Sequence, residues 1–366
     1  MSAFDLLPAE RLLPASDPLL QHTGRMDMRD PAGPVWQFPA CQVRMRLRGS
    51  TLRMFVSNTN HYYESRLGVM VNGCQHAVLL PQSGDAALDL SVYLTQEVND
   101  ILLFKRQDGS HTMTLRGFAV ERAAQLLPLP ARPARRMEFY GDSVTAGEVT
   151  EAIAYAGQCD PPHQGQYSNA WWGYAWQTAR LLDAELHDTA QGGIALLDRT
   201  GWFNGPDYVG MESCWDKALY NPSFGVVTPW DFSRYVPHVV VVALGQNDAN
   251  PRDYMASDPT GADAQRWKRA YRDFILRLRA RYQGATIILT TTILGHDRAW
   301  DDAIDEVCRG LAQTDSRIHH FLYTNNGCGT PGHIRKTEAA VMAQELAGFI
   351  RSLGDGVWED ASAMPG

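Results

Sequence analysis

Four short motifs supply the groups that hydrolysis of an ester through a serine would need. Ser143 ends a Gly-Asp-Ser tripeptide, Gly192 lies within Gln-Gly-Gly, Asn247 lies within Gly-Gln-Asn-Asp, and His333 follows Thr-Pro-Gly. The reaction requires a nucleophile, a base within hydrogen-bond reach of it, and donors that face the developing oxyanion. A serine hydroxyl, an imidazole, glycine N–H groups that can approach a ligand closely and a side-chain amide together meet these requirements.

Each motif lies at the end of a predicted strand or directly before a predicted helix. Met137–Tyr140 precedes the serine motif, Leu186–Ala190 the glycine motif, and the unbroken apolar run Val239–Leu244 the asparagine motif. His333 directly precedes the last helical segment, Arg335–Leu353. Open α/β sheets bind ligands at the carboxyl ends of their strands, so we expect the four motifs to face the same rim of one sheet.

Beyond residue 136 the chain alternates strand and helix patterns, which predicts a parallel sheet with helices on both faces. The other expected elements are the helices Ala170–Glu185, Asp263–Tyr282 and Trp300–Gln313 and the strands Thr286–Thr291 and Arg317–Leu322. Residues 192–238 fit neither pattern and are rich in Trp, Tyr, Asn, Gly and Pro. Long irregular insertions are usually functional, so we expect this insertion to lie over the active site.

A different pattern precedes this domain. Short β-type runs separated by Gly and Asn turns predict a β-sandwich or jelly roll over residues 23–127. The runs are Gln42–Leu47, Leu52–Ser57, Gly68–Val71, Ala77–Leu80, Ala87–Val92, Asn99–Lys105 and His111–Val120. Residues 1–22 are predicted to form a Leu- and Pro-rich leader and residues 128–135 a stiff linker, because repeated proline breaks strands and helices. A catalytic domain is then expected over residues 136–355 and a tail over residues 356–366.

The composition limits the possible partners. The chain has 33 basic and 41 acidic residues in 366, a net charge of −8, and no basic block. These values argue against nucleic acid or an anionic membrane as a partner and suit an uncharged substrate. The sequence has no zinc-type cysteine spacing, His-Glu-x-x-His motif, Walker loop or Asp-rich calcium loop, so it predicts neither a metal nor a nucleotide cofactor.

The sequence shows neither an export signal nor a membrane span. Its first residues lack a positive segment followed by a long apolar run, and no stretch approaches the ~20 apolar residues of a transmembrane helix. The six cysteines are dispersed and are expected to be reduced. The chain as written is therefore expected in the cytoplasm, or in the periplasm or outside the cell if an export signal has been removed.

In their order along the chain, the four motifs resemble the sequence blocks of the SGNH (GDSL-type) hydrolase superfamily. With a predicted β-sandwich in front, the region from about residue 23 to 353 is similar to carbohydrate esterase family two, the two-domain acetylxylan esterases. This resemblance implies an α/β fold: a C-terminal SGNH doubly wound parallel sheet flanked by helices, preceded by an N-terminal jelly roll. It also implies a serine esterase that removes O-acetyl groups from xylan or related plant oligosaccharides and needs no metal or organic cofactor.

One position departs from the superfamily pattern. Most members have an aspartate three residues before the histidine, where this chain has Thr330. A buried carboxylate normally fixes the imidazole tautomer and stabilises the imidazolium that forms. We expect a backbone carbonyl of the turn at Thr330 to accept a hydrogen bond from the His333 ring instead, which would give a Ser-His dyad. A carboxylate from elsewhere, such as the irregular insertion, remains an alternative.

The mechanism that the resemblance implies has two stages. His333 takes the proton of Ser143, which attacks the acetyl carbonyl, and water activated by His333 then releases acetate. The N–H groups of Ser143 and Gly192 and the side-chain amide of Asn247 would hold the oxyanion.

The remaining polar and aromatic residues are assigned mainly structural roles. Trp202 and Trp230, in the insertion, are candidates to stack on a sugar ring. Asp142 is expected to brace its own loop through backbone hydrogen bonds. Five histidines without a recognisable partner set are expected at the surface or at strand edges: His163, His238, His296, His319 and His320.

Two alternative functions stay open. One is a broader SGNH esterase, thioesterase or lipase for short acyl chains, which an acyl-chain-length series would identify. The other is a carbohydrate-binding protein whose hydrolase domain is inert. That idea rests on the missing aspartate, and the presence of Ser143, Asn247 and His333 opposes it.

Overall fold

The computed structural model describes residues 3–359, and the chain divides into two compact units. Unit 1 consists of Met1–Arg132, His163–Gln166 and Lys217–Trp230, and unit 2 of Pro133–Pro162, Tyr167–Asp216 and Asp231–Gly366. Residues 1–2 of the predicted leader and residues 360–366 of the predicted tail lie outside the described residues.

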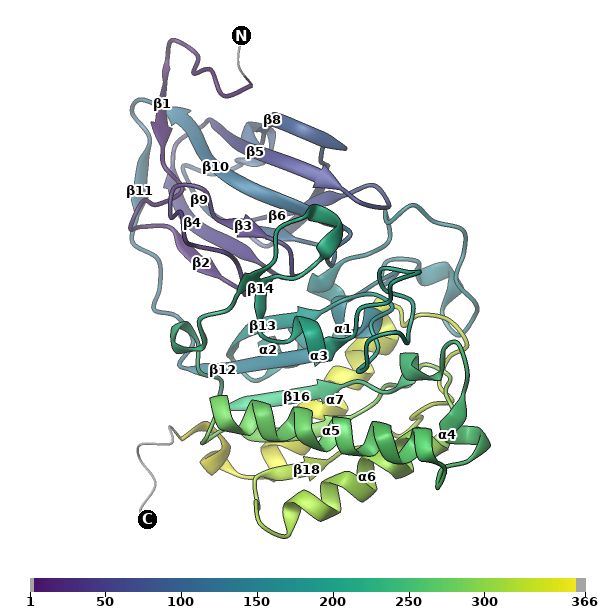
Figure 1. Ribbon diagram of the computed structural model, residues 1–366. Coiled ribbons are helices and arrows are strands. Elements are labelled where there is room, and N and C mark those ends of the chain that lie inside the picture. The colour runs from purple at the N-terminus through teal and green to yellow at the C-terminus, as the bar shows by residue number, and fades with distance from the viewer. Residues whose placement is uncertain (1–2, 360–366) are drawn as a thin grey trace. The chain divides into compact units, whose positions relative to one another are not determined.

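Unit 1 is a β-sandwich made of two antiparallel sheets (Figure 1). The first sheet has the order β1-β10-β5-β8, with β3 paired to β10, and the second has the order β11-β4-β9-β6-β7, with β2 paired to β4. The first contains β1 (Glu10–Leu13), β3 (Val35–Trp36), β5 (Leu52–Asn60), β8 (Ser83–Asp89) and β10 (His111–Glu121). The second contains β2 (Gln21–Thr23), β4 (Gln42–Arg48), β6 (Arg66–Val71), β7 (Cys74–Leu79), β9 (Val98–Lys105) and β11 (Gln125–Leu127). The predicted sandwich is confirmed.

The sandwich follows from the alternation of side chains along its strands. In β4, Val43, Met45 and Leu47 are fully buried, whereas the arginines between them are exposed or partly exposed. A strand with this period packs one face into a core and leaves the other face in water. The leader is part of the same structure, since β1 pairs with β10 and β2 pairs with β4. These edge pairings satisfy backbone groups that an unpaired leader would leave to solvent.

Unit 2 contains a parallel sheet of five strands in the order β13-β12-β16-β17-β18. The strands are β12 (Arg135–Gly141), β13 (Ala184–Ala190), β16 (Val239–Ala243), β17 (Thr286–Thr290) and β18 (Ile318–His320). The main helices are α2 (Tyr174–Leu181), α5 (Ala262–Arg281), α6 (Arg298–Ala312) and α7 (Lys336–Ser352). Figure 1 shows α5 and α6 on one face of the sheet and α2 and α7 on the other. The predicted doubly wound fold is confirmed.

Short elements complete this unit and the segment that returns to unit 1. They are α1 (Ser143–Ala146), α3 (Met211–Cys214), α4 (Tyr254–Ser257) and the hairpin strands β14 (Lys217–Leu219) and β15 (Thr228–Pro229).

One predicted helix is shorter than expected. Residues 170–185 were predicted to form a single helix, but Gly173 has an extended conformation (φ −61°, ψ 149°) that separates a 3₁₀ turn from α2. Asp183, with a φ of 51°, lies after the helix, and β13 begins at Ala184. The apolar spacing continues across Gly173 and Asp183, so the pattern alone does not reveal that the helix is interrupted at the first and has ended before the second.

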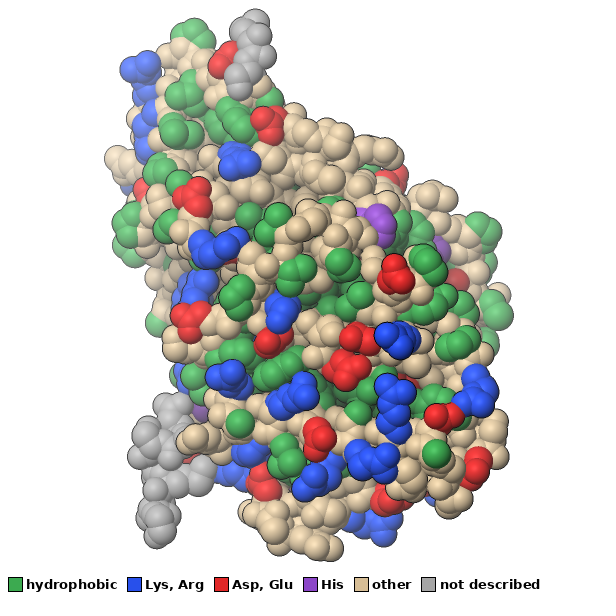
Figure 2. Space-filling view, in the orientation of Figure 1, with side chains coloured by type: hydrophobic (Ala, Val, Ile, Leu, Met, Phe, Trp, Pro, Cys, Tyr) green, Lys and Arg blue, Asp and Glu red, His purple; other side chains and the backbone are tan. Residues whose placement is uncertain are grey.

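The core of unit 2 lies on both faces of the sheet. Every residue of β16 is buried, as expected for a central strand covered by helices on both sides. The buried stripe of α5 recurs at helical spacing through Trp267, Tyr271, Phe274 and Leu278. Its outer face is charged, and Figure 2 shows basic and acidic side chains interspersed over α5 and α6.

The irregular insertion 192–238 is divided between the units. Lys217–Trp230 belongs to unit 1, where the backbone N–H of Gly109 donates to the Tyr220 hydroxyl at 2.9 Å and the side chain of Asn221 donates to the Gly109 carbonyl at 2.7 Å. Residues 192–216 and 231–238 belong to unit 2. Only these flanking parts of the insertion share a unit with the four motifs.

A search of residues 3–359 finds no helix long and apolar enough to cross a membrane. The same residues contain no group of three or more His, Cys, Asp or Glu side chains arranged to hold a metal ion.

Candidate active site

Ser143 begins α1, immediately after β12 ends at Gly141. Asp142 caps this short helix, since its carboxylate accepts from the Val144 N–H at 3.0 Å. Ser143 is 5% exposed, and among the described residues neither its hydroxyl nor its backbone N–H makes a hydrogen bond. The loop therefore holds the backbone at Ser143 in place while leaving the hydroxyl and the N–H available to a substrate.

Asp142 joins the serine motif to the asparagine motif. Its Oδ2 accepts from Gln246 Nε2 at 2.5 Å and from Asn247 Nδ2 at 3.1 Å. Burial raises the pKa of this carboxyl to about 6, although the hydrogen bonds from Gln246 and Val144 act in the opposite direction. Asp142 thus has the bracing role predicted for it, and it also holds a second loop.

The asparagine motif is in turn tied to the segment after the glycine motif. Asn247 Nδ2 donates to the Ile194 carbonyl at 3.1 Å, and the Asp248 carboxylate accepts from the N–H groups of Leu196 and Leu197 at 2.9 and 3.3 Å. Burial raises the pKa of Asp248 to about 7. Three sequence motifs that are predicted to share a rim are therefore connected by direct hydrogen bonds.

The glycine motif begins where β13 ends. Gln191 donates its backbone N–H to the Gly141 carbonyl at 3.2 Å, which places Gly192 beside the serine loop. Gly193 has a φ of 72°, and a Cβ at this residue would lie 2.8 Å from the Cβ of Trp202. Only glycine fits this turn, both in conformation and in space.

His333 is held by a carboxylate from a distant loop. Its ring Nδ1 donates to Asp160 Oδ2, and its backbone N–H donates to Asp160 Oδ1 at 2.9 Å. Arg335, which is fully buried, places Nη1 2.8 Å from the same Oδ1. An ionised carboxylate can only accept, so the Nδ1 atom carries a proton and Nε2 is the basic nitrogen of the neutral ring.

The predicted role of the turn at Thr330 is therefore wrong. The Thr330 carbonyl accepts from the Gly295 N–H at 2.9 Å, and the imidazole bonds to Asp160 instead. The carboxylate that orients His333 thus comes from the loop between α1 and α2, not from the irregular insertion. The sequence holds one related signal, Gly332, where a Cβ would lie 2.4 Å from the Gln158 carbonyl. That glycine admits the 158–160 segment against the histidine.

The Nε2 atom of His333 faces the residues that directly follow the serine. Glu148 donates its N–H to the Ser143 carbonyl at 2.9 Å, and its carboxylate lies 3.9 Å from His333 Nε2. The adjoining segments are also joined by the Lys336 N–H, which donates to the Thr150 carbonyl at 2.8 Å. The structure therefore brings the serine loop and the histidine loop together.

The charges around His333 change its acidity. Burial lowers the pKa of His333, but the hydrogen bond to Asp160 and the negative charges of Glu148, Asp160 and Asp142 raise it above its usual 6.5. Burial raises the pKa of Asp160, but His333 and Arg335 together bring it well below its usual range. Asp160 is therefore ionised at any pH where His333 can act as a base.

The two tryptophans predicted to contact sugar differ sharply. Trp202 is 63% exposed, and its backbone N–H donates to the Gly193 carbonyl at 2.7 Å, so this residue lies next to the glycine motif. Trp230 is only 6% exposed and belongs to unit 1, where the Arg25 guanidinium lies 5.3 Å from its ring centroid. Its buried face cannot stack on a ligand, and that prediction is corrected.

A pocket of about 580 Å³ opens beside the glycine and asparagine motifs. It is lined by Leu197, Asp198, Arg199, Thr200, Glu212, Pro251, Arg252, Tyr254, Asp263 and Arg266. None of these residues belongs to the four motifs, so the pocket adjoins the candidate site without forming it.

Residues 22–130 match the family model described as "Carbohydrate esterase 2 N-terminal". The chain is 24% identical over 363 residues to "Acetylxylan esterase / glucomannan deacetylase" of Cellvibrio japonicus, an alignment that covers 96% of this chain and 93% of the relative. It is related to family-two carbohydrate esterases. The resemblance predicted from the four motifs and the β-sandwich is thereby confirmed.

Two further comparisons extend this relationship. The chain is 28% identical over 272 residues to "Cellulase/esterase CelE" of Acetivibrio thermocellus; the match covers 74% of this chain and about a third (31%) of that relative. Its fold superposes with a TM-score of 0.77 on a family-two carbohydrate esterase from Clostridium thermocellum in complex with cellohexaose. That structure is 23% identical, with 93% of this chain and all of the other covered. The family-two fold therefore extends over both units.

Proposed function

We propose that this protein is a serine esterase that removes O-acetyl groups from carbohydrates. The observation that carries the proposal is the arrangement of His333, whose Nδ1 is held by Asp160 while its Nε2 faces the loop that begins at Ser143. A hydroxyl, an imidazole and an orienting carboxylate on one sheet rim are the parts of an acyl-transfer site.

Acylation begins at Ser143. His333 takes the hydroxyl proton through Nε2 as Ser143 Oγ attacks the acetyl carbonyl, and Asp160 stabilises the imidazolium that forms. His333 then gives this proton to the sugar oxygen, the C–O bond of the ester breaks, and the sugar leaves with its hydroxyl restored. Deacylation repeats these steps with water as the nucleophile and releases acetate.

The oxyanion is held by the N–H groups of Ser143 and Gly192 and by the side-chain amide of Asn247. Both amide hydrogens of Asn247 already have acceptors in Asp142 and Ile194, each 3.1 Å away. These contacts fix the direction of the amide before substrate arrives. The oxyanion would share one of the two hydrogens, which is a bifurcated arrangement.

Acetylated plant oligosaccharides are the substrates that these features support. The curated relative from Cellvibrio japonicus is described as acting on acetylated xylan and glucomannan, and the related Clostridium thermocellum structure holds cellohexaose. In this chain the exposed Trp202 ring next to Gly193 offers a flat apolar face to a pyranose ring. The net charge of −8 suits neutral glycans better than anionic ones.

The test is acetate release from acetylated xylo-, manno- and cello-oligosaccharides by the wild type and by Ser143→Ala. We expect release from at least one glycan and a loss of at least about 10³-fold in Ser143→Ala. Similar release by both proteins would overturn the nucleophile assignment. A parallel series of nitrophenyl esters from acetyl to octanoyl distinguishes a deacetylase from a broader esterase, since a deacetylase should lose activity steeply beyond the acetyl group.

A further inference from the structure

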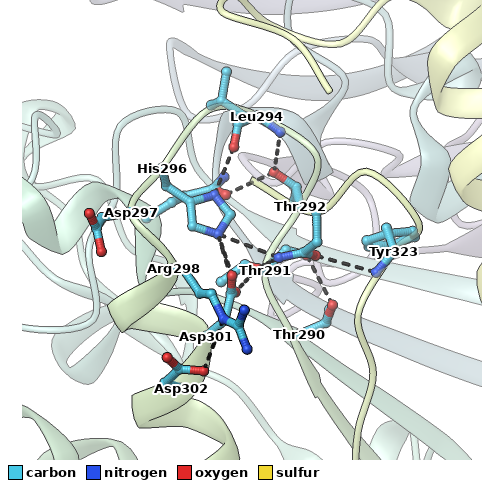
Figure 3. A network of polar contacts seen from close by, with 12 residues as sticks. Thr290, Thr291, Thr292, Leu294, His296, Asp297, Arg298, Asp301, Asp302 and Tyr323 are labelled. Carbon is cyan, nitrogen blue, oxygen red and sulfur yellow. Dashed lines mark hydrogen bonds and ion pairs between the residues drawn. The ribbon is translucent and has the colours of Figure 1, made fainter. Parts of the chain in front are cut away.

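His296, which the sequence predicts at the surface or at a strand edge, forms a buried ion pair. Its side chain is 2% exposed, and its Nε2 lies 3.2 Å from each carboxylate oxygen of Asp301, itself 7% exposed (Figure 3). Its Nδ1 lies 2.7 Å from the Leu294 carbonyl. Both ring nitrogens therefore face acceptors, an arrangement that favours the protonated ring, and Asn326 Nδ2 also lies 3.5 Å from Nε2.

This ion pair closes the segment between β17 and α6 into a fixed loop. The Leu294 N–H donates to Thr292 Oγ1 at 3.3 Å, and Thr291 Oγ1 donates to Asp301 Oδ1 at 2.5 Å. Burial lowers the pKa of His296, but the hydrogen bond and charge of Asp301 raise it above its usual 6.5. The ion pair and these hydrogen bonds hold the backbone of residues 291–296.

The loop reaches the proposed oxyanion site through Thr292, which is fully buried. Thr292 Oγ1 donates to Gln246 Oε1 at 2.8 Å, and Gln246 Nε2 donates to Asp142 Oδ2 at 2.5 Å. The same Oδ2 accepts from Asn247 Nδ2. Since each side of the Gln246 amide has its own partner, the hydroxyl of Thr292 determines how that amide is turned. A continuous path of hydrogen bonds thus ends at the Asn247 amide.

The loop also reaches the histidine side of the site. The Gly327 N–H donates to the Thr292 carbonyl at 3.0 Å, the His296 N–H donates to the Gly327 carbonyl at 3.1 Å, and the Gly295 N–H donates to the Thr330 carbonyl at 2.9 Å. Residues 327–330 lead directly into His333. The loop that His296 and Asp301 hold is therefore bonded to the segments that carry both Asn247 and His333.

We propose that His296, Asp301 and Thr292 are positioning residues, which set the Asn247 amide and the His333 loop for catalysis without touching the substrate. This inference rests on the proposed esterase function. A positioning role predicts a loss in kcat with little change in KM, because the misplaced groups act on the transition state more than on the bound sugar.

Thr292→Val is the sharpest test, because it removes only the hydroxyl and keeps the shape of the side chain. We expect kcat on acetylated oligosaccharide to fall about 10-fold with KM within threefold of the wild type, since one displaced oxyanion donor can cost up to about 10²–10³. Thr292→Ser, which keeps the hydroxyl, should recover most of the loss. A low kcat in Thr292→Val together with a nearly normal kcat in Thr292→Ser would not follow from a general loss of stability.

Asp301→Asn tests the ion pair, and the matched control is Asp305→Asn. Asp305 pairs with His320 Nδ1 at 3.2 Å and with Arg309 Nε at 2.9 Å and also lies on α6, but among the described residues it makes no hydrogen bond to Thr292 or Gln246. We expect a loss in kcat of about 10-fold for Asp301→Asn and less than about twofold for Asp305→Asn. The thermal unfolding of each variant is measured to verify that the variant is folded at the temperature of the assay.

The wild type and Ser143→Ala are measured in the same experiment. Ser143-dependent turnover with an unchanged kcat in Thr292→Val overturns this inference and leaves the esterase function standing. Equal losses in Asp301→Asn and Asp305→Asn overturn it as well. The absence of Ser143-dependent turnover in the wild type overturns both. If Asp301→Asn fails to fold, the comparison of Thr292→Val with Thr292→Ser decides.

Discussion

Asp160 binds His333 at two points, through Oδ2 to the ring Nδ1 and through Oδ1 to the backbone N–H at 2.9 Å. The two residues are 173 positions apart in the chain. This carboxylate fixes both the ring and the backbone that carries it, so the imidazole has one orientation before substrate binds. In this chain the carboxylate that orients the histidine comes from a loop that follows the first parallel strand. Most members of the SGNH superfamily have an aspartate three residues before the histidine instead.

Asp160→Asn is expected to lower kcat by about 10²- to 10⁴-fold, because an amide no longer stabilises the imidazolium and can favour the wrong tautomer. Steady-state kinetics on an acetylated oligosaccharide and on nitrophenyl acetate measure the change. Thr330→Ser is the control, since it keeps the backbone carbonyl of Thr330 in place, and should stay within about threefold of the wild type. A near-normal kcat in Asp160→Asn would remove Asp160 from the mechanism.

Glu148→Gln is expected to move the acidic limb of the kcat/KM profile to lower pH. His333 acts as a base only when neutral, so activity rises as pH increases through its pKa, which Asp160 and Glu148 raise above 6.5. Removing the charge 3.9 Å from Nε2 lowers that pKa. Glu151→Gln is the control, since its carboxylate accepts from Asn169 at 2.8 Å. A limb that stays in place or moves to higher pH would contradict the assignment.

Asn247→Ala is expected to lower kcat by about 10²–10³-fold, the usual cost of one oxyanion donor. KM should change much less, because the ground-state carbonyl depends less on this donor than the oxyanion does. Asn204→Gly removes a partly exposed amide that donates to the Asp207 carbonyl at 3.2 Å, tolerates the φ of 61° at this residue and should leave kcat unchanged. If Asn247→Ala retains more than about a third of the activity, the oxyanion must be held by other donors.

Trp202→Ala is expected to raise KM on oligosaccharides by about 2- to 10-fold, in line with the contribution of one aromatic face. Activity on nitrophenyl acetate should change little, because that substrate has no sugar to stack. Trp202→Phe keeps a flat ring and should recover part of the loss. Equal losses on both substrates would indicate that Trp202 supports the glycine motif through its backbone neighbours instead of contacting sugar.

Much of the fold could be predicted because its signals are local. β16 was visible as the unbroken apolar run Val239–Leu244, and the strands of the sandwich as short β-type runs separated by turn residues. The four motifs could be placed on one rim because parallel strands present their carboxyl ends together. Ser143, Gly192 and Asn247 were selected by their position after such strands, His333 by its position before the last helix, and all four by the resemblance of their motifs to SGNH blocks.

The partners of those residues depend on packing between segments with no periodic pattern. Asp160 lies in an irregular loop, and nothing in its neighbours distinguishes it from an ordinary surface aspartate until His333 is placed beside it. Trp230 was selected for its place in the insertion and His296 was assigned to the surface for lack of a recognisable partner, whereas the structure buries both, beside Arg25 and Asp301 respectively. The sequence by itself determined the order of strands, helices and reactive groups, because these follow from spacing along the chain. Only the tertiary structure decided which carboxylate orients the histidine, since contacts across 173 residues arise from packing and leave no local pattern.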